Sequence, residues 1–161
     1  MTNNIESFKS QIQEDIQLIS TEWGYIDENL KKPEYAFNYW ILSRIFSIDE
    51  ELILDSITEY NDKCIDCFAH FPDSKELIII QNKYYDDDTV VNRGEVADFL
   101  KTPISVLMNN EYRKSPELQK LFNECKDDSE YKISLYFFST TDKKSGDINS
   151  ISNNLILKIM V

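Results

Sequence analysis

Residues 65–85 read IDCFAHFPDSKELIIIQNKYY, with two apolar runs on either side of a short polar segment. The runs Ile65 to Phe71 and Leu77 to Tyr84 are rich in aromatic and β-branched residues, which favour strands. Between them, Pro72-Asp73-Ser74-Lys75 consists mainly of residue types that are common in tight connections. The pattern predicts a β-hairpin whose strands are joined by these four residues.

The register of this hairpin would bring polar side chains together. Side chains alternate between the faces of a strand, so Gln81 and Lys83 point the same way, about 6.6 Å apart. If Phe71 pairs with Glu76, Asp66 lies opposite Gln81, with their β-carbons about 5 Å apart. Asp66, Gln81 and Lys83 then share one face near the open end of the hairpin. The opposite face carries residues that we expect to pack: Ile65, Cys67, Ala69, Ile78 and Ile80.

A carboxylate, an amide and an ammonium group on rigid strands suit the hydrolysis of a phosphodiester. A carboxylate and a carbonyl oxygen can hold Mg²⁺ or Mn²⁺, which polarises the phosphoryl group and activates water. A lysine stabilises negative charge that develops in the transition state. The sequence therefore predicts Asp66, Gln81 and Lys83 as catalytic residues.

Helices and further strands are predicted around the hairpin. Apolar spacing predicts a helix over residues 5–19, Pro33 begins another to about Phe46, and a capping-box pattern at Ser47 predicts a short helix through Leu54. After the hairpin, helices are expected over 93–101, 102–109 and 116–125, the last two each begun by a cap residue and a proline. Strands are expected over 131–139 and 155–161. This order predicts a single α/β (α+β) domain over residues 1–161.

The composition limits the class of protein. The chain is 42% hydrophobic and 12% aromatic, enough for a core, and its few glycines and prolines form no linker. No apolar run approaches the ~20 residues of a membrane span, and the N-terminus has no signal-peptide pattern, so we expect a cytoplasmic protein without membrane contact. Three cysteines fit a reducing compartment. The apolar segment at residues 155–161 has two explanations. It is either a terminal strand, or the point at which a longer protein would continue, so that this chain would be its N-terminal part.

The net charge is −12, from 17 basic and 29 acidic residues. Nucleic-acid binding depends on lysine and arginine displacing counterions from phosphates, so this balance disfavours a DNA-binding protein that acts alone. It fits a catalytic module that grips nucleic acid with help from regions outside this chain. It fits equally a protein whose partner is not nucleic acid.

The motif around the predicted site resembles a known group of nucleases. Ile65-Asp66 followed by Gln81-Asn82-Lys83-Tyr84-Tyr85 is similar to the (I/V)D…QxK(Y/R)Y signature of Mrr-like restriction-endonuclease folds, which are PD-(D/E)XK proteins. In particular it resembles the N-terminal nuclease-like domain of the abortive-infection phage-resistance (AIPR) family. The likeness covers about Tyr35 to Ser139, with Ala36-Phe37-Asn38-Tyr39 matching the first core helix.

The resemblance implies a fold, a metal and a partner. The fold would be an αβββαβ core with a mixed central sheet flanked by helices, preceded here by an extra N-terminal helix. Asp66, Gln81 and the Asn82 carbonyl would hold Mg²⁺ (or Mn²⁺), and Lys83 would be the catalytic lysine. The partner would be nucleic acid, with DNA favoured over RNA. A homodimer would allow both strands of a duplex to be cut.

Some residues depart from the pattern of these relatives. Asn38 stands where a glutamate is common on the first helix, and Glu34, one turn earlier, is the alternative acid. Lys63 and Cys64 replace the glycines that usually precede the aspartate. Arg93 begins the helix after the lysine strand and could reach a phosphate. The departures leave open a catalytically degraded nuclease fold that acts as an interaction or regulatory module, and the acidity leaves open a DNA mimic.

Two other motifs have ordinary explanations. Cys64-x-x-Cys67-x-x-His70 has zinc-like spacing, but alternation along a strand puts Cys67 on the face opposite Cys64 and His70, and no second pair completes a tetrahedral set. We therefore interpret the cysteines as small buried residues. Asp86-Asp87-Asp88 follows the lysine strand and is typical of a solvated loop.

Overall fold

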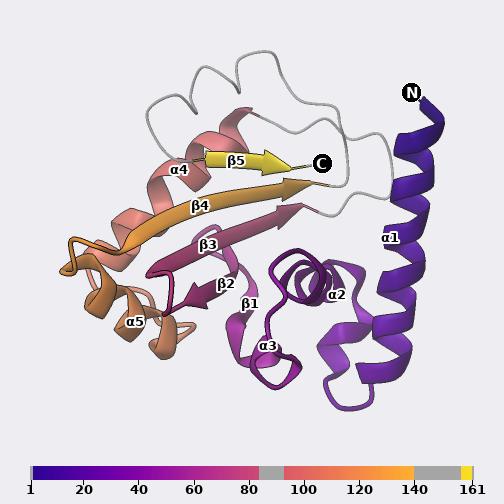
Figure 1. Cartoon of the computed structure of the whole chain (residues 1–161), viewed down its shortest axis with the longest axis horizontal. Helices are drawn as coiled ribbons and strands as arrows, with labels where there is room; N and C mark the ends of the chain where they lie inside the picture. The colour runs from indigo at the N-terminus through magenta and orange to yellow at the C-terminus, as the bar shows by residue number, and fades with distance from the viewer. Residues whose placement is uncertain (1, 84–92, 140–156, 161) are drawn as a thin grey trace. The chain divides into compact units, whose positions relative to one another are not determined.

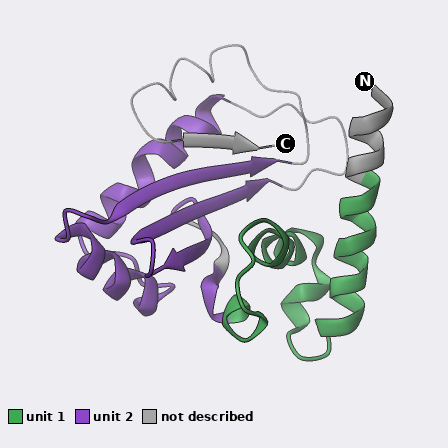
Figure 2. Cartoon of the chain, in the orientation of Figure 1, with its two compact units in different colours: residues 1–54 green, residues 55–161 purple. Residues whose placement is uncertain are grey.

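The computed structural model describes residues 2–83, 93–139 and 157–160. The chain divides into two compact units, unit 1 at residues 1–54 and unit 2 at residues 55–161 (Figure 2). The single domain expected from the sequence stays a prediction. Unit 2 contains the hairpin and therefore the predicted catalytic residues.

Unit 1 is helical, as the apolar spacing predicted. Its elements are α1 Thr2–Trp23, η1 Glu28–Lys31, α2 Pro33–Trp40, the π-helical turn η2 Ile41–Ile45, and α3 Glu50–Ser56, which runs two residues past the unit. The Trp40 indole Nε1 donates a hydrogen bond to Asp15 Oδ2 at 3.0 Å and so joins α2 to α1. No helix of the described residues, the long α1 included, is apolar enough to cross a bilayer.

The start of α3 differs from the prediction. The capping-box pattern placed the helix cap at Ser47, but α3 begins at Glu50. Ser47 instead has a φ of 53°, in the left-handed region, and belongs to the turn that leaves η2. In that turn the Ile48 N–H donates to the Leu42 carbonyl, so local turn geometry overrides the capping signal.

Unit 2 is built on a mixed sheet with the strand order β1-β2-β3-β4-β5 (Figure 1). The strands are β1 Ile57–Asp62, β2 Ile65–Phe71, β3 Glu76–Lys83, β4 Lys132–Ser139 and β5 Leu157–Met160. β1, β2 and β3 run antiparallel in turn, whereas β3, β4 and β5 run parallel. The mixed sheet and the α+β class are as predicted, while β1 was not located from the residues.

The β2–β3 hairpin has the predicted register. Phe71 pairs with Glu76 and Cys67 pairs with Ile80 across the four-residue connection. Lys75, the last residue of that connection, has a φ of 53°, and its carbonyl accepts a hydrogen bond from Lys132 N at 2.9 Å. Its ammonium forms ion pairs with Asp128 and Glu130. The turn is thereby fixed to the start of β4.

Helices α4 Arg93–Met108 and α5 Pro116–Lys126 connect β3 to β4. The predicted break at Thr102-Pro103 is wrong, because α4 continues through Pro103. Proline removes one helical hydrogen bond, but this ring is buried, and its burial offsets part of that cost. The start of α5 is as predicted: Ser115 is the N-cap, and its Oγ accepts from Leu118 N at 3.2 Å.

The core of unit 2 lies between the sheet and these two helices. Phe99 of α4 meets Phe137 of β4 with ring centroids 5.8 Å apart. Strand residues in this core include Phe68, Leu77, Ile79, Leu135 and Phe137. Alternation along β2 and β3 puts Asp66, Gln81 and Lys83 on this same face, beyond the last apolar layer. Four of the residues predicted to pack on the opposite face are buried as expected: Cys67, Ala69, Ile78 and Ile80. Ile65 is also buried, but it packs in the core between the sheet and the helices instead.

Candidate functional site

Asp66 is a buried carboxylate with a main-chain partner. The register of β2 and β3, continued by one residue, sets Asp66 opposite Gln81. The side chain then reaches along the next strand, where Asp66 Oδ2 accepts a hydrogen bond from Asn82 N at 2.7 Å. Hydrogen bonds to a charged acceptor are short and strong, so this bond fixes the orientation of the carboxylate.

Gln81 and Lys83 follow Asp66 on the same face. Asp66 and Gln81 are each only 2% exposed, whereas the Lys83 side chain is 19% exposed. The polar groups thus run from a buried pair outward to a lysine at the end of β3. The side chain of Asn82 turns to the opposite face, where its Nδ2 lies 3.9 Å from Cys67 Sγ.

Glu95 is a residue of this site that the sequence analysis missed. Its Oε1 lies 4.0 Å from Lys83 Nζ, and its side chain is 37% exposed. Glu95 belongs to the first turn of α4, where a carboxylate also interacts favourably with the helix dipole. The only available signal was an acid in the first turn of the helix that follows the lysine strand.

Cys64, directly before β2, lies among the charged groups of the site. Burial is the largest influence that raises the pKa of its thiol, and the Asp98 and Asp66 carboxylates raise it further. The Lys83 ammonium and a hydrogen bond with Thr102 lower the same pKa. Groups from β2, β3 and α4 therefore lie within electrostatic reach of one thiol.

One face of α4 supplies the helical side of this cluster. Glu95, Asp98 and Thr102 follow one another at spacings of three and four, so they share a face of the helix. Glu95 forms an ion pair with Lys83. Asp98 raises the pKa of the Cys64 thiol, and Thr102 lowers it. The candidate site is thus the end of the β2–β3 hairpin together with the first turns of α4.

The donor set decides which metal ion the site could hold. Asp66 offers a carboxylate, Gln81 an amide carbonyl and Asn82 a main-chain carbonyl that points to the same side of β3 as its N–H. Hard oxygen donors of this kind suit Mg²⁺ or Mn²⁺. Within residues 2–83, 93–139 and 157–160, no three His, Cys, Asp or Glu side chains group as metal ligands. An ion held by one carboxylate and two carbonyl oxygens would take its remaining ligands from water.

Comparison with known proteins adds no family to this geometry. No family model, curated protein or solved structure matches the chain. The likeness to restriction-endonuclease folds therefore rests on the motif residues alone. It stays a prediction.

The auxiliary residues predicted from the sequence have different outcomes. Glu34 and Asn38 belong to α2 in unit 1, where Asn38 is buried and Glu34 lies in the first turn. Arg93 is the exposed first residue of α4, two residues before Glu95. The predicted features at Tyr84, Tyr85 and residues 86–88 lie outside the described residues.

Cys64, Cys67 and His70 each have a different partner. A hydrogen bond with Thr102 lowers the pKa of the Cys64 thiol, and Cys67 is fully buried beside Asn82. The His70 Nε2 shares a hydrogen bond of 2.7 Å with the Tyr131 hydroxyl. The three side chains thus serve separate packing contacts, in line with the structural interpretation of the cysteines.

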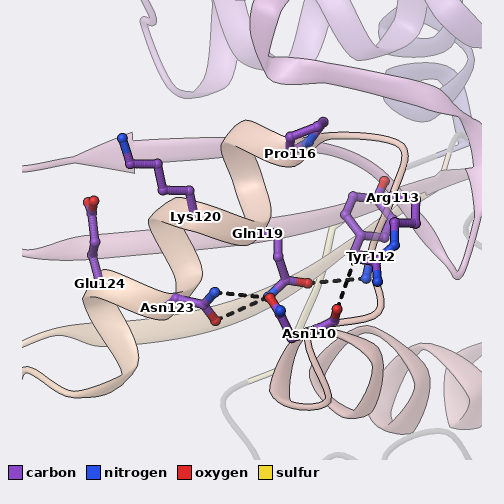
Figure 3. A pocket seen from close by; sticks show the side chains of 8 residues that line it. All are labelled: Asn110, Tyr112, Arg113, Pro116, Gln119, Lys120, Asn123 and Glu124. Carbon is purple, nitrogen blue, oxygen red and sulfur yellow. Dashed lines mark hydrogen bonds between the residues drawn. The ribbon is translucent and has the colours of Figure 1, made fainter.

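A cavity of about 450 Å³ lies on α5 and the loop before it, apart from this site (Figure 3). Gln119 is one of its lining residues: its Oε1 accepts from Tyr112 N at 3.1 Å, and its Nε2 donates to the Leu107 carbonyl at 2.8 Å. Asn123 Nδ2 donates to Asn110 Oδ1 at 3.1 Å. These hydrogen bonds of side-chain amides hold the loop against α5, so we interpret Gln119 and Asn123 as structural residues.

Proposed function

We propose that the chain is a metal-dependent hydrolase of nucleic-acid phosphodiesters, with its catalytic residues in unit 2. The observation that carries this proposal is the position of Asp66, Gln81 and Lys83 on one face at the open end of the hairpin. Glu95 and the first turns of α4 border the same place. Together the groups offer oxygen donors for a cation and an ammonium for a phosphate.

Each residue would have a distinct task. Asp66, Gln81 and the Asn82 carbonyl would hold Mg²⁺ or Mn²⁺, which supplies polarisation of the phosphoryl group and activation of water. The Asn82 N–H orients the Asp66 carboxylate, so the donor is set before any ligand binds. Lys83 would contact a non-bridging phosphate oxygen and stabilise the charge that grows on it in the transition state.

The proposal extends to the setting of the protein. By its motif we propose a restriction-endonuclease-like αβββαβ core and a role in abortive infection against phage, in the cytoplasm. Nucleic acid, DNA ahead of RNA, is the proposed substrate, and a homodimer would allow both strands to be cut. Because the chain carries a net charge of −12, we propose that regions outside it contribute to nucleic-acid binding.

Plasmid nicking in the presence of Mg²⁺ or Mn²⁺ tests the proposal. We expect Asp66→Asn and Lys83→Gln each to lower the cleavage rate by about 10²–10³, the usual effect of losing one group that stabilises a transition state. Asn is chosen over Ala because it keeps an acceptor oxygen for the buried Asn82 N–H. The exposed Asp127→Asn and Lys126→Gln make matched charge changes on α5 and its C-cap and should leave the rate unchanged. Cleavage that is equally fast in all four variants would remove the mechanism.

A second candidate is an interaction or regulatory module that has lost catalysis. Asp66 and Gln81 are each 2% exposed, and the described residues hold no group of three metal-ligating side chains. Titration with Mn²⁺, followed by electron paramagnetic resonance, separates the two candidates. Binding that Asp66→Asn abolishes favours the hydrolase, and the absence of binding, or binding that ignores this change, favours the module.

A further inference from the structure

Lys83 and Glu95 are brought together by the fold rather than by the local sequence. Lys83 is in the last described position of β3, and Glu95 lies in the first turn of the next helix. Lys83 Nζ and Glu95 Oε1 are 4.0 Å apart, with side chains 19% and 37% exposed. The pair is thus partly shielded from water but still open to a ligand.

Glu95 stands on a rigid support. Val96 and Phe99, in the same part of α4, are fully buried in the core of unit 2. Further along α4, Thr102 lies near enough to Cys64, the residue directly before β2, for a hydrogen bond between them to lower the pKa of the thiol. Lysine, by contrast, has a flexible four-carbon stem that loses much rotamer freedom when it is held in one place.

We propose that Glu95 is a positioning residue that holds the Lys83 ammonium at the end of β3, on the face that carries Asp66 and Gln81. This inference rests on the proposed hydrolase function, because it assigns Glu95 a task within the same site. The carboxylate limits the conformers of the lysine before substrate binds. Phosphate then meets an ammonium that is already directed to the site.

Positioning has a kinetic signature that simple charge repulsion lacks. Removing the Glu95 charge releases the lysine, so kcat falls. Removing a negative charge near a phosphate also weakens repulsion, so KM stays the same or falls. If Glu95 acted only by repelling substrate, kcat would be unchanged and KM alone would fall.

Steady-state cleavage of a plasmid by the full chain tests this signature. We expect Glu95→Gln to lower kcat about two- to fivefold, the effect of a partly exposed ion pair, without raising KM. Glu95→Asp keeps the charge on a shorter stem, so its kcat should lie between those of the wild type and Glu95→Gln. The matched control is Glu117→Gln, which removes an acid from the first turn of α5. An unchanged kcat in Glu95→Gln overturns the positioning role.

A second measurement does not depend on cleavage. Brief acylation with a succinimidyl ester, followed by peptide mass spectrometry, reports how freely each lysine amine reacts. In Glu95→Gln we expect Lys83 to react about two- to fivefold faster, while Lys126, exposed on α5, keeps its rate. An unchanged rate at Lys83 overturns the inference. If the wild type cleaves no substrate, the proposed function fails and this measurement alone decides the role of Glu95.

Discussion

A carboxylate inside a protein needs partners, and at the residue scale Asp66 shows how one can be provided. Burying a charge without compensation is costly, so buried acids are paired, hydrogen-bonded or bound to metal. Here the main-chain N–H of Asn82 donates to the carboxylate at 2.7 Å. Only a substitution of Asn82 by proline would remove this donor, because every other residue keeps its main-chain N–H. The geometry of Asp66 therefore depends on the strand pairing itself.

His70 is the only histidine of the chain, and burial lowers its pKa below the ordinary 6.5, with Glu124 partly opposing this. As the pH falls through 6.5, the unfolded chain therefore takes up a proton before the folded protein does. By linkage, the free energy of unfolding should fall over that range and level off below the folded pKa.

Urea unfolding between about pH 8 and pH 5 measures this effect. The wild type should lose more stability on acidification than His70→Gln does, and the Hε1 signal of the one imidazole ring in proton NMR gives the folded pKa directly. A folded pKa at or above 6.5 would contradict the prediction.

At the scale of elements, the hairpin was predictable because its information is local. Four turn residues between two apolar runs fix the register, and alternation then fixes which side chains share a face. β1 was missed because Ile57 is the only aliphatic residue in Ile57–Asp62, so neither alternation nor an apolar run marks it. The prediction of a break at Pro103 was wrong because a local rule was applied where burial in the core decides the outcome.

The N-cap of α5 provides a test at this scale. Ser115 Oγ accepts from Leu118 N at 3.2 Å, and Ser115 is itself buried. We expect Ser115→Ala to lower the free energy of unfolding by about 1 kcal/mol, the usual loss for an N-cap. Ser105→Ala, at an exposed position inside α4, is the control and should not destabilise, because alanine favours helix interiors. Equal urea midpoints for the wild type and Ser115→Ala would show that the cap contributes nothing.

Glu95 marks the limit of prediction for the candidate site. Asp66, Gln81 and Lys83 lie on two strands that are neighbours in the sequence. Their position on a common face could therefore be predicted from the sequence alone. Glu95 reaches Lys83 only because α4 docks on the sheet through buried residues such as Phe99. Contacts that depend on how a helix packs cannot be derived from spacing along the chain.

For the molecule as a whole, the excess of acids has a consequence for stability. A chain with 17 basic and 29 acidic residues repels itself more in the compact state than when it is unfolded. Raising the salt concentration from about 0.01 M to about 0.15 M shortens the screening length from about 30 Å to about 8 Å. We expect the midpoint of urea unfolding to rise as a result, with an unchanged slope. A midpoint that falls with salt would instead mean that attractive pairs such as Lys75–Asp128 dominate.

The parallel pairing of β3 with β4 sets an order of assembly. The hairpin needs only neighbouring residues, whereas β4 joins β3 after both α4 and α5 have been traversed. Nearby segments meet sooner than distant ones, because closing a long loop costs more entropy. During folding, Asp66 can therefore meet Asn82 before the helix that carries Glu95 has packed against the sheet, and the metal-binding half of the proposed site would form before the half that restrains its lysine.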